Sequence, residues 1–134
     1  MRILIVDNDK NTVETLKAAL ENEKDIAVDT AYSGREALEK LTADPSYALL
    51  VLDIMMPEVS GIDVCAAMAG SEKMRSIPVL LISALPIESK EFQQSLNKFN
   101  ELAVIKDAIE KPFSMADFTA KVRAVIAGAG PNGK

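Results

Sequence analysis

Short apolar runs alternate with amphipathic stretches from one end of the chain to the other. Three of the runs consist almost wholly of Val, Leu and Ile, at 3–6, 48–52 and 78–82. A run without alternation is typical of a parallel strand that is buried on both faces. The segment 26–31 alternates apolar and polar residues and predicts a less buried strand, and 107–110 predicts a weak one.

In the segments between these strands, apolar residues recur at helical spacing. In 10–21 the apolar positions Val13, Leu16 and Leu20 recur at helical intervals. Serine residues and an Asp–Pro pair mark where other helices begin and end. These helices are predicted from Ser33, with Glu36 as its capping partner, to Asp44–Pro45, over 61–69, over about 88–102, and from Ser114 to about Ala127.

Strands that alternate with helices in this way predict the fold class. We expect an α/β domain with a doubly wound parallel sheet, (βα)5, in which right-handed crossovers place helices on both faces. One domain is expected over 1–127, and 128–134 is expected to be a flexible tail or the start of a linker.

Two residue types limit the chemistry that the chain can perform. It contains no His, and Cys65 is its single Cys. These two facts exclude His-ligated metals, Ser–His and Cys–His nucleophiles, a phosphohistidine on this chain, an intramolecular disulfide and a Cys-based zinc site. Catalysis or group transfer must therefore use carboxylates, Lys, Ser or Thr.

The formal net charge of −5 bears on partners and location. An excess of acid argues against direct binding to nucleic acid and against an anionic membrane surface. No apolar run approaches the ~20 residues that span a bilayer. The first run reaches Asp7 too soon to be a signal peptide. We therefore expect a cytoplasmic protein.

A polar residue stands at the end of four of the predicted strands. These residues are Asp7, Asp53, Ser83 and Lys111. Because the carboxyl ends of parallel strands share one edge of a sheet, the four side chains should meet there. Taken alone, each would be read as a helix cap or a surface residue, but four in equivalent places indicate a site.

The residue types at this edge favour a divalent metal and a phosphoryl group. Two neighbouring carboxylates repel each other, and Mg²⁺, which prefers oxygen ligands, relieves that repulsion. Lys111 adds a positive charge beside an incoming phosphoryl group, and Ser83 adds a hydroxyl donor. Without His or a reactive Cys the nucleophile must be a carboxylate, so the product is an acyl phosphate.

Four segments resemble the landmarks of response-regulator receiver domains. They are ILIVDND at 3–9, LDIMMPEVSG at 52–61, PVLLISA at 78–84 and KPF at 111–113, in the family's order. The resemblance implies that Asp53 is the phosphoacceptor, that Ser83 is the switch hydroxyl and that Lys111 contacts the phosphate. It implies Mg²⁺ ligands from Asp7, Asn8, Asp53 and the backbone carbonyl of Met55. It also implies a cis peptide before Pro112, a close approach at Gly61 and the flavodoxin-like strand order 2-1-3-4-5.

The same resemblance implies a signalling role rather than an enzyme with an external substrate. The phosphoryl group would come from a histidine kinase or a His-containing phosphotransfer protein. The surface of the fourth helix, fifth strand and fifth helix would then change and signal to an output domain or protein. Self-catalysed phosphotransfer and autodephosphorylation are the only chemical steps expected.

Three features depart from the family pattern. The second acid after the first strand is Asn8, which predicts weaker Mg²⁺ binding unless Asp9 compensates. The aromatic switch position is Ala108, which argues against relay through a rotating ring. The stretch from Ser83 to Lys111 is longer than usual, which predicts a remodelled output surface.

Two alternatives remain open at this point. Asp7-Asn8-Asp9 also fits the start of a haloacid-dehalogenase phosphohydrolase, although that reading leaves the Asp53 motif unexplained. Alternatively, Asn8 and Ala108 fit a pseudo-receiver, a binding module that keeps the fold and is not regulated by phosphorylation. A small phosphodonor distinguishes the hydrolase from the receiver, because it should label Asp7 in the first and Asp53 in the second. A magnesium titration with a phosphate mimic distinguishes the pseudo-receiver, which should show no Mg²⁺-dependent change.

Overall fold

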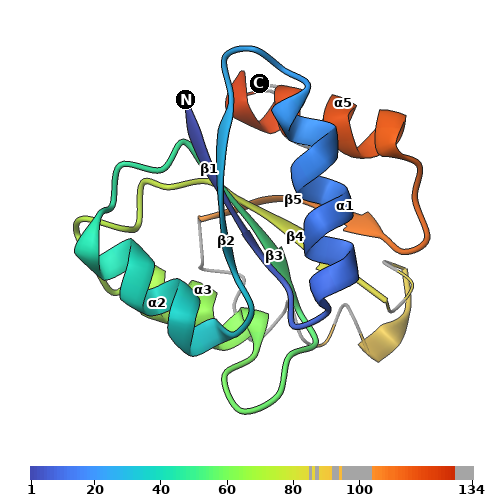
Figure 1. The fold of residues 1–134 in the computed structure, drawn as a ribbon. Helices are drawn as coiled ribbons and strands as arrows, with labels where there is room; N and C mark the ends of the chain where they lie inside the picture. The colour runs from blue at the N-terminus through green and yellow to red at the C-terminus, as the bar shows by residue number, and fades with distance from the viewer. Residues whose placement is uncertain (85, 87, 92–93, 95–103, 129–134) are drawn as a thin grey trace.

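The computed structural model describes residues 1–84, 86, 88–91, 94 and 104–128. Its strands and helices follow one another in strict alternation over most of the described chain (Figure 1). They are β1 (Arg2–Val6), α1 (Lys10–Glu21), β2 (Ala27–Ala31), α2 (Gly34–Ala43), β3 (Leu49–Asp53), α3 (Gly61–Ala69), β4 (Val79–Ser83), β5 (Ile105–Glu110) and α5 (Met115–Ile126). None of the helices in the described residues has the length and apolar character needed to cross a bilayer.

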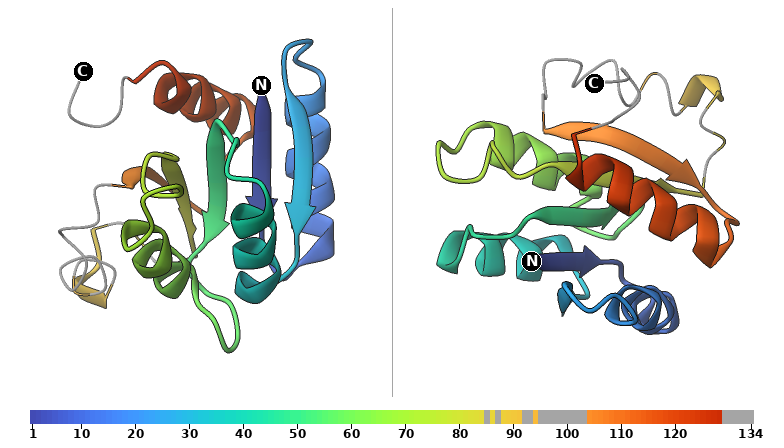
Figure 2. Two further views of the ribbon diagram at one scale, coloured as in Figure 1. Left: turned by 90° about the vertical axis from the view of Figure 1, so that its left-hand side faces the viewer. Right: turned by 90° about the horizontal axis from the view of Figure 1, so that it is seen from above.

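The strands form one parallel sheet of order β2-β1-β3-β4-β5, which confirms the order 2-1-3-4-5 implied by the sequence. Helices α1 and α5 cover one face of the sheet, and α2 and α3 cover the other (Figure 2). Strand order reverses between β1 and β3, so the crevice at their carboxyl ends is where a ligand is expected in such a sheet.

Two apolar cores explain why the central strands are uninterrupted runs of Val, Leu and Ile. Successive side chains of a strand point to opposite faces of the sheet. In β1, Ile3 and Ile5 pack beneath α1 and α5, whereas Leu4 and Val6 pack beneath α2 and α3. Every position of β3 and β4 is buried, while β2 at the sheet edge is only partly so, as its alternating pattern predicts.

The structure differs from the predicted boundaries mainly at β5. This strand begins at Ile105 rather than Asp107, because Lys106 forms a bulge where the pairing with β4 shifts register. A bulge breaks the simple alternation on which the sequence pattern relies. The helix predicted over about 88–102 lies largely outside the described residues, as does the tail after Gly128.

Helix capping also differs in detail from the sequence reading. Ser33 accepts the Glu36 N–H at 3.0 Å, but the Glu36 carboxylate accepts from the Tyr32 N–H instead of closing a box on Ser33. The reciprocal box is found at α3, between Ser60 and Asp63.

A polar network ties the sheet together near the amino end of β1. The Arg2 guanidinium lies 2.6 Å from Asp29 Oδ2, also pairs with Asp44, and stacks 4.5 Å from the centre of the Tyr47 ring. The Tyr47 hydroxyl donates to Asp29 at 2.7 Å. The Ser46 hydroxyl, and then Arg2, lower the pKa of Asp44 to about 2, while Arg2 and the Tyr47 hydroxyl lower that of Asp29. The network thus joins β1, β2 and the segment entering β3.

Candidate functional site

All four strand-end residues lie at the carboxyl edge of the sheet. Asp7 follows β1, Asp53 ends β3, Ser83 ends the neighbouring β4, and Lys111 follows β5. The Lys111 N–H donates to the Ser83 carbonyl at 2.7 Å, which fixes the lysine beside the end of β4. The parallel register therefore brings together residues that are far apart in the sequence.

Lys111 contacts both carboxylates. Its Nζ lies 3.3 Å from Asp7 Oδ2 and 3.9 Å from Asp53 Oδ2. Asp7 is 1% exposed and Asp53 4%, so water screens neither charge well. One ammonium facing two buried carboxylates leaves the centre with an excess of negative charge.

This excess is reflected in the ionisation of Asp53. Burial, and then the neighbouring Asp7 carboxylate, raise the pKa of Asp53 to about 6, while Lys111 and the Met55 N–H oppose the shift. The Met55 N–H donates to Asp53 Oδ1 at 3.2 Å. Since a buried carboxylate with a raised pKa is an incompletely compensated charge, the site favours an added cation.

The backbone around the site is closely packed. A Cβ atom on Gly61 would lie 2.3 Å from the Asp53 carbonyl oxygen, which is far inside van der Waals contact. The Gly61 N–H donates to the Ile54 carbonyl at 3.0 Å. Glycine is therefore required where the loop after β3 enters α3, as the sequence indicated. The Lys111–Pro112 peptide is cis, as the resemblance implied.

Asp9 does not compensate for the missing acid at Asn8. Its Oδ1 accepts the Asn11 N–H at 3.0 Å and its Oδ2 accepts the Thr12 hydroxyl at 2.8 Å. The Thr12 bond is the main cause of its lowered pKa. Asp9 is the N-cap of α1, a role that sequence reasoning missed although an Asp before a helix is the usual signal for it. Asn8 itself is exposed.

The oxygen donors at this edge could hold a hard divalent cation. Asp7 and Asp53 offer carboxylates, Asn8 an amide oxygen and Met55 a backbone carbonyl, and Mg²⁺ accepts such ligands together with water. No cluster of three or more Cys, Asp or Glu side chains suited to a metal occurs in the described part of the chain. The donor set thus fits Mg²⁺ with fewer charged ligands than three acids would give.

The position of the expected aromatic switch is filled by a small side chain. Ala108 is partly buried, packs against the core beneath α2 and α3, and pairs with Leu81 of β4. Ser83, in contrast, is fully buried at the end of β4. The hydroxyl of the predicted switch is therefore present beside the site, while the ring is absent from its usual position.

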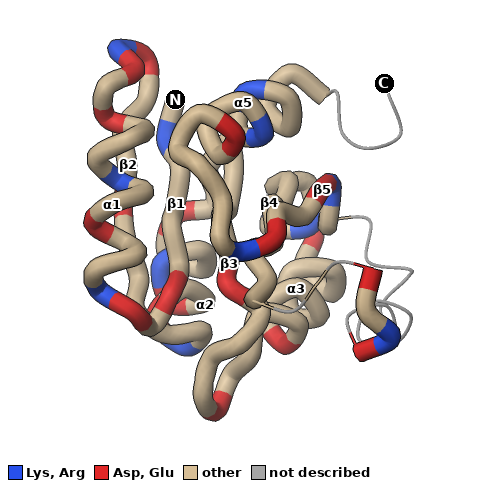
Figure 3. The backbone as a smooth tube through the Cα atoms, turned by 90° about the vertical axis from the view of Figure 1, so that its right-hand side faces the viewer, with Lys and Arg blue, Asp and Glu red and all other residues tan. Residues whose placement is uncertain are grey.

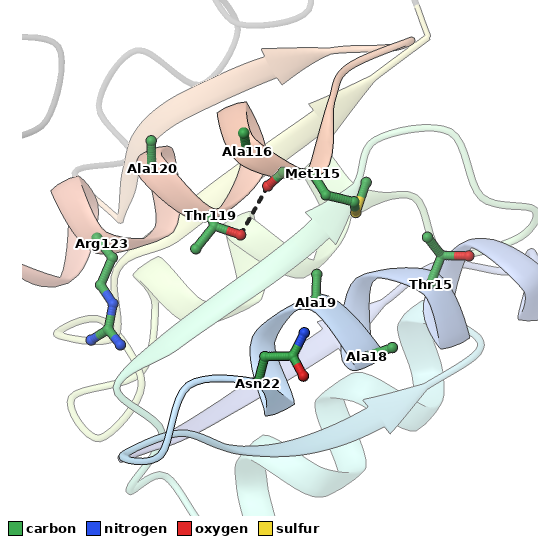
Figure 4. Close-up of a pocket in the computed structure, with 9 residues that line it drawn as sticks. All are labelled: Thr15, Ala18, Ala19, Asn22, Met115, Ala116, Thr119, Ala120 and Arg123. Carbon is green, nitrogen blue, oxygen red and sulfur yellow. Dashed lines mark hydrogen bonds between the residues drawn. The ribbon is translucent and has the colours of Figure 1, made fainter.

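Two hollows lead away from Lys111 along one face of the molecule. The first, of about 350 Å³, is bordered by Lys111, Phe113 and α1 residues that include Asn11. The second, of about 610 Å³, lies between α1 and α5 and is lined by alanines from both helices (Figure 4). Thr15 and Met115 line both, so they form one groove that begins at the site.

Charged positions elsewhere are mixed in sign. Along the backbone of the described chain, Lys and Arg positions are interspersed with Asp and Glu positions (Figure 3). Arg123 of α5, for example, lies 2.8 Å from Glu23 and 2.9 Å from Asp25, which ties α5 to the segment between α1 and β2.

Comparison with known proteins identifies relatives over nearly the whole chain. A family model described as response regulator receiver domain matches residues 3–123. The response regulator MprA of Mycobacterium tuberculosis is 32% identical over 126 residues, which cover 94% of this chain and 50% of that protein. A CpxR homolog of Haemophilus influenzae, a transcriptional regulatory protein, is 33% identical over 125 residues, with 93% and 50% covered. This chain therefore spans about half the length of these relatives.

Solved structures show the same architecture. The signal receiver domain of a signal transduction histidine kinase from Syntrophus aciditrophicus has a TM-score of 0.79 and 28% identity, covering 95% of this chain and 90% of that one. The chemotaxis protein CheY4 of Vibrio cholerae has a TM-score of 0.79 at 22% identity, covering 92% and 97%, a likeness that concerns the fold.

Proposed function

Because the chain belongs to the response-regulator receiver family, we propose that it accepts a phosphoryl group on Asp53 and passes a signal on. The observation that carries this proposal is the placement of Asp53, 4% exposed, with the Lys111 ammonium 3.9 Å from its Oδ2 and the buried Ser83 at the end of the adjacent strand. Membership of the family supports a signalling role rather than that of a classical enzyme.

The proposed step is an in-line phosphoryl transfer. A carboxylate oxygen of Asp53 forms a bond to phosphorus, and the bond from phosphorus to the imidazole nitrogen of a phosphohistidine breaks, with its electron pair staying on the imidazole. Lys111 neutralises charge that develops on the phosphoryl oxygens. Mg²⁺, when held by Asp7, Asn8, Asp53 and the Met55 carbonyl, would supply further neutralisation of the same oxygens. Later hydrolysis returns the carboxylate and inorganic phosphate.

Ser83 supplies the proposed link from chemistry to conformation. Its hydroxyl would move to donate to a phosphoryl oxygen and so favour one of two arrangements of the segments after β4. Because Ala108 offers no ring to rotate, the change would pass through the backbone of β4 and β5, which pair from Val79 to Ser83. The receiver unit would occupy 1–127, with 128–134 leading towards an output domain or ending in a tail.

The phosphodonor would be a histidine kinase or a His-containing phosphotransfer protein. This chain has no His of its own to carry the group. The groove that begins at Lys111 offers such a partner a surface lined by Thr15 and Met115, and the Lys111 ammonium lies 3.9 Å from Asp53 Oδ2.

Labelling with radioactive acetyl phosphate in the presence of Mg²⁺ tests the proposal. Wild type should gain one base-labile phosphoryl group, Asp53→Ala should gain none, and the matched control Asp117→Ala, an exposed aspartate of α5, should behave as wild type. Undiminished labelling of D53A would overturn the assignment. Loss of the label in D7A alone would favour the hydrolase, and no label or Mg²⁺ response in wild type would favour a pseudo-receiver.

A further inference from the structure

The amino-terminal end of α2 lies directly against the loop that follows the phosphoacceptor strand. Gly34 is the first residue of α2 and is buried. A Cβ atom at Gly34 would lie 2.5 Å from the Val59 carbonyl oxygen and 2.7 Å from Val59 Cγ1. Because real Cβ atoms do not come so close to other heavy atoms, only glycine allows this approach.

One residue in the loop from Ile54 to Ser60 has an unfavourable backbone conformation. Glu58 has φ of 65°, the left-handed region that residues other than glycine rarely enter. Such a conformation persists only where the surrounding structure fixes it. Val59 is the next residue, so the contact with Gly34 acts immediately beside the strained position.

The same loop carries the groups that face Asp53. Ile54 and Met56 are each 7% exposed and anchor the loop in the core, whereas Met55 between them is 55% exposed. The Met55 N–H donates to Asp53 Oδ1 at 3.2 Å. A displacement of Val59 would therefore be transmitted along a few residues to the backbone of Met55 and the carboxylate that it contacts.

We infer that Gly34 is a positioning residue for the phosphoacceptor site, because it lets α2 close on Val59 and thereby fixes the loop that aligns Met55 with Asp53. Gly34 acts from the far side of this loop, through its contact with Val59. The inference rests on the proposed function only for its consequence in phosphoryl transfer. Whether Gly34 fixes the loop can be measured by amide exchange in the absence of phosphate and metal.

Gly34→Ala tests the inference, with Gly70→Ala as the matched control. At Gly70, the C-cap of α3, a Cβ would find its nearest atom at 3.7 Å and so would fit. We expect G34A to fold by circular dichroism but to need roughly 10-fold more Mg²⁺ for half-saturation, the effect typical of losing a group that supports metal ligands. In metal-free hydrogen exchange the amides of Met55 and Gly61 should exchange faster in G34A, whereas G70A should match wild type.

A second substitution separates positioning from a general loss of packing. Val59→Ala removes Cγ1, at 2.7 Å from the new Cβ of G34A, but leaves the Val59 carbonyl oxygen at 2.5 Å. V59A introduced into G34A should therefore restore only a small part of the Mg²⁺ affinity. Wild-type Mg²⁺ binding and exchange in folded G34A would overturn the inference. If G34A does not fold, V59A alone decides: it should speed exchange at Met55 and Gly61, and unchanged exchange would overturn the inference.

The two proposals can fail separately. A wild-type protein that takes no label on Asp53 would remove the proposed function, while the metal-free exchange comparison would still decide the role of Gly34. Conversely, wild-type labelling together with identical exchange in wild type, G34A and V59A would leave the function standing and remove the positioning role.

Discussion

The Lys111 ammonium lies closer to Asp7 than to Asp53: its Nζ is 3.3 Å from Asp7 Oδ2 and 3.9 Å from Asp53 Oδ2. The cation is therefore shared, and neither carboxylate is fully neutralised. A phosphoryl group bound to Asp53 would place new negative charge next to Nζ and draw the lysine from Asp7. An anion bound at Asp53 can therefore change the position of the Lys111 side chain.

Lys111→Met should slow phosphoryl uptake from acetyl phosphate by about 100-fold, because a single positioned donor to developing charge contributes on that order. The rate is measured by labelling at saturating Mg²⁺. Lys121→Met is the control, since Lys121 pairs with Asp107 at 3.0 Å instead of with the site. A rate within a factor of about three of wild type would contradict a role for the Lys111 charge.

Asp53→Asn should stabilise the fold at neutral pH in metal-free buffer. The pKa of Asp53 is raised to about 6 in the folded chain, against 3.8 for the free group. Because its pKa is raised on folding, the Asp53 carboxyl makes its full contribution to stability only at pH values below its pKa in the unfolded chain. That contribution is lost as the pH rises through the folded pKa of about 6. The ionised group then costs on the order of 3 kcal/mol, which the amide of Asn avoids.

Urea unfolding at a series of pH values checks this expectation. The free energy of unfolding of D53N should exceed that of wild type near pH 7, and the difference should shrink as the pH falls towards 4. Added Mg²⁺ should reduce the difference at pH 7, because the cation stabilises only the ionised carboxylate. A difference that is independent of pH would mean that the stabilisation has another origin.

Asn8→Asp should tighten Mg²⁺ binding by roughly 10-fold, because it adds a negative charge to a donor set that has only two. The binding constant can be followed by thermal shift or calorimetry. Asn22→Asp, the same chemical change at the C-cap of α1, is the control. Equal Mg²⁺ affinities in N8D and wild type would show that Asn8 does not face the cation.

Thr15→Arg should discriminate between phosphodonors. Thr15 lines the groove that begins at Lys111, so a bulky cation there should hinder a docked protein partner but not a small molecule. We expect transfer from a cognate phosphohistidine protein to fall by at least about 10-fold while the rate with acetyl phosphate stays unchanged. Ala66→Arg on the exposed part of α3 should leave both rates intact, and equal slowing in T15R and A66R would argue against docking along the groove.

The sequence predicted the sheet and the site placement because both depend on local patterns. Uninterrupted apolar runs identified β1, β3 and β4, and the polar residue after each run fixed its place at the carboxyl edge. At β5 the pattern predicted the strand but missed its first two residues, because the Lys106 bulge interrupts the alternation. It also missed the capping role of Asp9, which is evident from its bonds to Asn11 and Thr12. The contact between Gly34 and Val59 joins segments distant in the chain, so no local signal could reveal it.

The Arg2 network and the site occupy opposite ends of the same strands. At about 3.3 Å per residue, the length of β1 separates Arg2 from Asp7 by roughly 17 Å, which exceeds the screening length of physiological salt. Protonation of a carboxylate at the site should therefore have little effect on the pKa values in the Arg2 network. Acidification that protonates Asp53, whose pKa is raised to about 6, would leave Asp29 and Asp44, whose pKa values are lowered, ionised beside Arg2. The chain should therefore lose the charge of its phosphoacceptor at a higher pH than it loses the Arg2 network.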